Sequence, residues 1–108
     1  MKQSRYKPYV FCLLAGMGAT VVAAPDTDRQ AELLYLLKHD CGSCHGMTRK
    51  GGLGPPLLPE TLNEKPQLML VNTVLYGRPG TPMPPWGGEL SEQEAQWLVE
   101  VMIRGEGL

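Results

Sequence analysis

The sequence predicts an all-α protein with three main helices. Three segments, at about 28–39, 67–76 and 91–104, place apolar side chains at the three- and four-residue spacing of a helix face. The alternating apolar and polar pattern that is typical of strands is almost absent. Glycine and proline are concentrated between the three segments, where they interrupt regular structure. We therefore expect short helices joined by long loops.

The first helix is predicted from about Asp28 to about His39. Thr27 fits its N-cap, and Gln30 stands where a capping box needs a side chain that reaches back to the cap. The residues that follow are good helix formers. The inward face is expected to carry three apolar or small side chains, Ala31, Leu34 and Leu37.

The second helix is predicted over 67–76. Pro66 suits its first position, and Gly77 stands where a C-terminal cap is expected. One helical turn is expected before it, at 61–63. Its apolar side chains occur at helical spacing: Leu68, Val71, Val74 and Leu75.

The third helix is predicted to begin at Ser91, with Glu94 completing a capping box, and to end before Gly105. Its apolar side is formed by Ala95, Leu98, Val99 and Met102. The segment before it, 78–88, contains four prolines and is predicted to be an extended loop, because proline fixes its own dihedral and biases the preceding residue away from helix. Met83 lies inside this stiff loop.

Residues 1–24 resemble a secretory signal peptide. Positive charges at Lys2, Arg5 and Lys7 precede an apolar run, and small residues follow it. We expect cleavage after about Ala24, which leaves one periplasmic domain at 25–108 and removes Cys12. The alternative is a retained membrane anchor, which is disfavoured because the apolar run is shorter than the roughly 20 residues that span a bilayer.

The charge of the predicted mature chain disfavours nucleic acid as a partner. The whole chain has a formal net charge of −1, and removal of the three basic residues of the signal changes it to −4. Nucleic-acid-binding domains are usually basic. With 13 glycines and 10 prolines, so short a chain closes only a small core unaided. A buried cofactor would supply the apolar centre.

The motif Cys41-Gly42-Ser43-Cys44-His45 has the pattern C-x-x-C-H, which is typical of covalent haem attachment. Cysteines three apart on a helical turn point the same way, so both can form thioethers to one haem while His45 offers a nitrogen to the iron. Three alternatives are a thioredoxin-like redox pair, half of a zinc site, and a disulfide between Cys41 and Cys44. His39 lies too close to the motif to reach the opposite haem face, and we interpret it as a surface histidine.

Three helices, a C-x-x-C-H motif after the first and a proline-flanked methionine before the last resemble a class I c-type cytochrome. The resemblance implies one covalently bound haem c held by Cys41 and Cys44, with His45 as the proximal and Met83 as the distal iron ligand. Gly54-Pro55-Pro56-Leu57 is similar to the family's G-P-x-L segment, in which the carbonyl of the proline, here Pro55, accepts a hydrogen bond from the ligand histidine. Such a bond orients the ring and tunes its donor strength. The alternative for Met83 is an apolar filler.

The loop at 77–86 resembles that of the small periplasmic NirC group, which is encoded with cytochrome cd1 nitrite reductase. This implies single-electron transfer in denitrification and no enzymatic activity of its own. The redox partner would be the cd1 nitrite reductase or proteins of d1 haem biosynthesis and maturation. Two other hypotheses are a haem-based sensor or ligand-binding module with a labile Met83, and a docking domain that transfers no electrons.

Two expectations concern association. Three basic residues, Arg49, Lys50 and Arg78, lie in loops that flank the haem motif and predict docking at the exposed haem edge; ordinary solvated loop charge is the alternative. The chain is expected to be a monomer, and at high concentration a dimer that exchanges the third helix, because Gly87 and Gly88 permit an opened hinge.

Overall fold

The computed structural model describes Gly16, Gly18 and residues 23–108. The predicted signal peptide therefore lies almost wholly outside the described residues, and its cleavage after Ala24 stays a prediction. Within the described ranges, no helix is long and apolar enough to cross a membrane.

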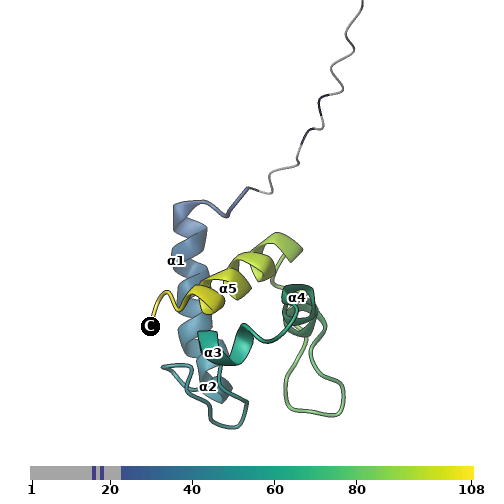
Figure 1. Ribbon diagram of the computed structural model, residues 1–108. Coiled ribbons are helices and arrows are strands. Elements are labelled where there is room, and N and C mark those ends of the chain that lie inside the picture. Colours follow the sequence, from purple (N-terminus) through teal and green to yellow (C-terminus); the bar gives the residue numbers. More distant parts are fainter. Residues whose placement is uncertain (1–15, 17, 19–22) are drawn as a thin grey trace, which may run out of the picture.

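The described part of the chain consists of helices and loops and contains no strand, which confirms the all-α prediction (Figure 1). In chain order the elements are α1 (Thr27–Leu36), a π-helical segment (Leu37–Cys41), α2 (Gly42–His45), α3 (Pro59–Leu62), α4 (Gln67–Tyr76) and α5 (Glu92–Arg104). The predicted short turn before the second helix corresponds to α3, which begins two residues earlier than expected. Pro59 opens it, since proline suits the first helical turn.

The N-cap of α1 is Asp26, so the prediction of Thr27 was wrong. The Asp26 side chain accepts a hydrogen bond from the Arg29 backbone nitrogen at 2.9 Å. Gln30 donates instead to the Pro25 carbonyl at 2.7 Å and completes no capping box. Aspartate and threonine both cap helices, and the carboxylate adds a negative charge at the positive end of the helix dipole.

The helix that begins at Thr27 does not end at His39 as predicted. The backbone winds on through the π-helical segment, where the Gly42 nitrogen donates to the Leu37 carbonyl, and then through α2 to His45. Single π-helical turns often occur beside functional sites. Here the wider turn places the whole C-x-x-C-H motif on the end of one continuous helix.

The inward face of α1 also differs from the prediction. Leu33 is fully buried and Leu37 is nearly so, whereas Ala31 and Leu34 are exposed. Leu33 and Leu37 are four residues apart and so lie on one stripe of the helix. The sequence offered two adjacent leucine stripes, and the packing of α5 against α1 selects the one through Leu33.

The core surrounds α5, which crosses α1 and also contacts α3 and α4 (Figure 1). All four predicted apolar residues of α5 are buried, and Val101 joins them. On α4, Val71 and Leu75 are buried and Val74 is half-buried, whereas Leu68 is exposed. The core is therefore assembled from both ends of the described domain.

The start of α5 has the predicted capping box. The Ser91 hydroxyl accepts from the Glu94 backbone nitrogen at 3.1 Å, and the Glu94 carboxylate accepts from the Ser91 backbone nitrogen at 2.9 Å. The same carboxylate receives the Arg29 Nε of α1 at 2.6 Å. These contacts, led by the Arg29 hydrogen bond, lower the pKa of Glu94.

Candidate cofactor site

A cavity of about 680 Å³ lies between the C-x-x-C-H helix, α4, α5 and the two long loops. Its lining includes all six residues predicted from the sequence: Cys41, Cys44, His45, Pro55, Leu57 and Met83. Much of the remaining wall is apolar and comes from Leu70, Val74, Trp86, Val99 and Met102. A largely apolar cavity with a few convergent polar groups is the usual form of a cofactor site.

The ring of His45 is oriented by a backbone carbonyl. Its Nδ1 lies 2.7 Å from the Pro55 carbonyl oxygen, the contact that the G-P-x-L resemblance implies. A carbonyl oxygen can only accept, so Nδ1 carries the proton and donates. The lone pair is then on Nε2, which leaves this nitrogen able to bind a metal.

Gly54 lets the backbone lie against the face of that ring. A Cβ at this position would meet Cε1 and Nδ1 of His45 at 2.7 Å, closer than such atoms approach. The Gly54 nitrogen donates to the Cys44 carbonyl at 2.8 Å, and the Gly51 nitrogen donates to the His45 carbonyl at 2.8 Å. The loop thus satisfies carbonyls that the end of a helix leaves without partners.

The two cysteines of the motif are free thiols that line the same cavity. Burial, assisted by the charge of Asp40, raises the pKa of Cys41 to about 11. Reactive redox pairs have lowered thiol pKa values, so this environment does not favour the thioredoxin-like alternative. Among the described residues, no three His, Cys, Asp or Glu side chains gather as a metal-binding group.

The proline-rich loop brings Met83 to the cavity and is pinned by Thr81, which the sequence analysis missed. The Thr81 hydroxyl donates to the Arg78 carbonyl at 2.7 Å and accepts from the Met83 nitrogen at 3.4 Å. The Arg78 nitrogen also donates to the Met83 carbonyl at 3.2 Å. Gly77, at φ 69°, leaves room for this return, because a Cβ there would lie 2.8 Å from the Met83 carbonyl oxygen. A hydroxyl two residues before the methionine was the available signal.

Comparison with known proteins gives the family. Residues 28–102 match the family described as cytochrome c oxidase, cbb3-type, subunit III. Cytochrome c55X of Pseudomonas aeruginosa is 62% identical over 82 residues, which are 76% of this chain and 69% of the relative. A solved structure described as c-type cytochrome NirC superimposes with a TM-score of 0.75 at 60% identity and covers 77% of this chain and 98% of its own. The chain is a NirC-type class I c-type cytochrome.

A second relative of the cytochrome is much longer. The chain is 39% identical over 92 residues to the dihydro-heme d1 dehydrogenase of Pseudomonas aeruginosa, and the match covers 85% of this chain but 17% of that protein. The cytochrome therefore resembles one part of a larger redox enzyme.

Family membership gives the cytochrome a covalently bound haem c. The described residues fit this group: two thiols, a histidine with a free Nε2 and a methionine converge on one largely apolar cavity. No separate donor set competes for the metal among the described residues.

The other candidate ligands lie in different settings. Met47 and Met69 are exposed, whereas Met102 is buried on α5 and forms part of the cavity wall. His39 is exposed and packs on Tyr35 with ring centroids 4.2 Å apart, which confirms its interpretation as a surface histidine.

One of the three basic residues predicted to form a docking surface is not at the surface of the cytochrome. Lys50 and Arg78 are exposed, but Arg49 is 3% exposed. Its Nη2 donates to the Glu106 carbonyl beyond α5, and burial lowers its pKa. Arg49 is therefore unavailable to a partner, and the predicted surface retains two charges.

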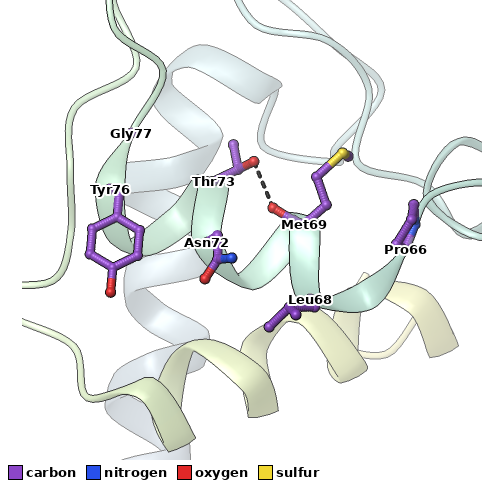
Figure 2. A pocket seen from close by; sticks show the side chains of 7 residues that line it. All are labelled: Pro66, Leu68, Met69, Asn72, Thr73, Tyr76 and Gly77. Atoms are coloured by element: carbon purple, nitrogen blue, oxygen red, sulfur yellow. Dashed lines mark hydrogen bonds between the residues drawn. The ribbon is translucent and has the colours of Figure 1, made fainter.

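A second depression lies on the outer side of α4 and is open to solvent (Figure 2). Leu68, Met69 and Tyr76 contribute exposed apolar surface there. Thr73 lines both this depression and the haem cavity, with its hydroxyl donated to the Met69 carbonyl at 2.8 Å (Figure 2). The depression contains none of the predicted ligands and shares Thr73 alone with the lining of the cofactor cavity.

Proposed function

We propose that the cytochrome is a periplasmic single-electron carrier and not an enzyme. Cys41 and Cys44 would attach the haem, and His45 and Met83 would bind its iron. The observation that carries the proposal is the shared cavity, in which the Pro55 contact leaves Nε2 of His45 free and the pinned loop presents Met83. The haem supplies a one-electron ferric and ferrous couple when bound.

The protein groups would set how that couple behaves. Two protein ligands leave the iron no open position for a substrate, so electron exchange remains. A thioether ligand favours the ferrous state and raises the potential relative to two histidines. The hydrogen bond from His45 to Pro55 would strengthen the imidazole as a donor, and the largely apolar wall would limit the access of water to the iron.

The finer role proposed is electron transfer in denitrification, either to cytochrome cd1 nitrite reductase or to redox steps of d1 haem biosynthesis. The likeness to part of a dihydro-heme d1 dehydrogenase supports the second route, because a unit similar to this chain is built into that enzyme. The loop at 77–86, which resembles the NirC group, supports either route.

Stopped-flow mixing tests the proposal. The reduced cytochrome is mixed with purified oxidised cytochrome cd1 nitrite reductase, and oxidation of its haem is followed by absorbance. In a separate experiment the oxidised cytochrome is mixed with purified dihydro-heme d1 dehydrogenase and its dihydro-haem substrate, and reduction of its haem is followed. Rapid electron transfer in either experiment, saturating with concentration, identifies the route. Binding without oxidation would contradict the carrier function and support a docking domain. A ferrous spectrum altered by carbon monoxide at neutral pH would support the sensor hypothesis.

A further inference from the structure

Arg49 is a buried cation within the loop that follows the haem motif. Its side chain is 3% exposed, while the neighbouring Lys50 is exposed. Nη2 donates to the Glu106 carbonyl, and Nη1 is buried without a hydrogen-bond partner among the described residues. Burying a charged group with an incompletely satisfied donor is unfavourable, so we looked for a role of Arg49 that compensates for it.

The backbone of Arg49 joins two further segments. Its nitrogen donates to the Gly46 carbonyl at 2.9 Å, and its carbonyl accepts from the Leu57 nitrogen at 2.9 Å. Its φ of 58° is a left-handed conformation that is uncommon for a residue with a side chain. One residue therefore connects the end of α2, the Pro55–Leu57 segment and the end of α5.

We propose that Arg49 is a positioning residue that fastens the loop at 46–57 to the end of α5 and so holds the Pro55 carbonyl against His45. The Arg49 carbonyl accepts a hydrogen bond from the Leu57 nitrogen, and Leu57 is two residues beyond Pro55. Without the Glu106 contact, the loop would retain its short-range bonds but lose its side-chain link to the segment after α5, and α3, which follows the loop, would be left to connect it to α5. This inference rests on the proposed role of His45 as an iron ligand.

The charge of Arg49 has a second effect, which acts on the anchor and on the reduction potential. A cation beside the C-terminal end of α5 interacts favourably with the helix dipole, which strengthens the anchor. A buried positive charge in the loop that packs against the ligand histidine also disfavours the ferric state more than the ferrous state. The reduction potential should therefore depend on Arg49 more than on an exposed lysine.

The test uses the haem-loaded cytochrome and three variants, Arg49→Gln, Arg49→Lys and Lys50→Gln. Proton NMR measures solvent exchange of the His45 Nδ1 proton, with the core amide of Leu98 as a report of global opening, and a redox titration gives the potential. We expect Arg49→Gln to speed exchange at His45 about tenfold, the loss of one charge-assisted hydrogen bond. Exchange at Leu98 should stay unchanged. The lost charge lowers the potential, whereas the weakened hydrogen bond of His45 raises it, so the potential is compared with that of Arg49→Lys, which keeps the charge.

The other variants separate positioning from charge and from stability. Arg49→Lys should restore most of the parental exchange rate at His45 and most of the parental potential, because it keeps the charge and a donor. Lys50→Gln should change neither the exchange rate nor the potential. Equal acceleration at His45 and Leu98 would reduce Arg49 to a structural residue and overturn the inference. So would parental behaviour in Arg49→Gln, or a change in potential as large in Lys50→Gln. A parent protein whose His45 protons show no haem-induced shift would instead refute the ligand role.

Discussion

At the residue scale, the ring of His45 rests against backbone atoms on the side of Gly54. Only a glycine allows this approach, because a Cβ there would lie 2.7 Å from two ring atoms. The same ring needs its position to keep the 2.7 Å bond to Pro55. The orientation of the proposed ligand therefore depends on a residue that does not bind the cofactor.

Replacing Gly54 with alanine should displace the His45 ring and break its bond to Pro55. We expect a loss of about 0.5–1.5 kcal/mol in the free energy of unfolding, the usual net contribution of one hydrogen bond, together with an altered low-spin spectrum. Denaturant titration and absorbance measure the two effects. The control is Gly88→Ala, where an added Cβ meets nothing within 4 Å. Similar losses in both variants would show that the effect is not specific to the ring.

Replacing Met83 with alanine should open the iron to carbon monoxide and lower the potential. The expected change exceeds tenfold in the ferric to ferrous equilibrium, or about 59 mV for one electron. Met102→Leu is the matched control, because Met102 is the other methionine in the cavity wall. An unchanged spectrum in Met83→Ala in both oxidation states would remove Met83 from the ligand role, and a changed one in Met102→Leu would point to that residue instead.

The chemistry of single residues could be predicted wherever it depends on near neighbours. The motif at 41–45 and the Gly54-Pro55 segment carry their signals locally, and the structure brings them to one cavity. The burial of Arg49 could not be predicted, because it depends on a carbonyl 57 residues further along the chain. A glycine-rich basic loop is usually solvated, and here the C-terminal segment covers it.

At the element scale, the two main N-caps separate what a sequence pattern can and cannot decide. Ser91 and Glu94 form the predicted capping box, whereas α1 is capped by Asp26 in place of Thr27. Before α5, Ser91 fits the capping pattern and the pattern identifies the N-cap. Before α1, Asp26 and Thr27 are adjacent and both can cap a helix, so the pattern does not decide which one is the N-cap.

Removing the cap of α5 should destabilise the protein measurably. Ser91→Ala is expected to cost about 1 kcal/mol in the free energy of unfolding, the usual value for a lost N-cap hydroxyl. Thr27→Ala is the control, because Thr27 fits a capping pattern but does not serve as the cap. Chemical denaturation measures both variants, and equal losses would contradict the observed assignment.

The contact between α1 and α5 should make stability depend on acid. The Arg29 guanidinium lowers the pKa of Glu94 in the folded state, so the carboxylate is stabilised by folding. That contribution is present above the unfolded carboxyl value of about 4.3 and is lost as the pH falls through the lower folded value. Glu94→Gln should therefore lower the melting temperature at pH 7 and flatten its fall below pH 4. Parallel pH curves for parent and variant would refute this.

The end of the first helix could not be predicted from local pattern. The polar residues Lys38, His39 and Asp40 are typical of a helix terminus, yet the backbone continues to His45 through a π-helical turn. The choice of buried stripe on α1 was equally invisible, because Leu33 and Leu34 are interchangeable until α5 packs against one of them. Both outcomes depend on contacts between distant elements.

At the scale of the whole molecule, α5 is joined to the rest of the domain through one hinge. The loop returns to α4 where the Trp86 and Gly87 nitrogens donate to the Val74 and Leu75 carbonyls at 3.0 and 2.9 Å. Gly88 follows with nothing near it. The packing of α5 on α1 and α4 uses contacts that a second copy of the chain could provide equally well.

We expect a monomer at low concentration and a helix-exchanged dimer after storage at high concentration. The dimer should survive dilution and revert on mild heating, because exchange requires α5 to leave its core contacts. Size-exclusion chromatography with mass measurement checks this. Gly88→Pro, which stiffens the hinge that must open, should lower the dimer fraction. A single monomer peak at every concentration would contradict the proposal.

The crossing of α1 and α5 also has a consequence for the order of assembly. Leu33 and Leu37 belong to one buried core with residues of α5, near the end of the chain, and Arg29 meets Glu94 across 65 residues. A chain in which α5 has not yet packed therefore has no closed core. During that interval the part of the cavity wall that α5 supplies, Val99 and Met102, is missing, so the motif is more open to solvent. Covalent attachment of the haem at the motif is thus easiest before folding finishes. Packing of α5 then closes the domain around the haem.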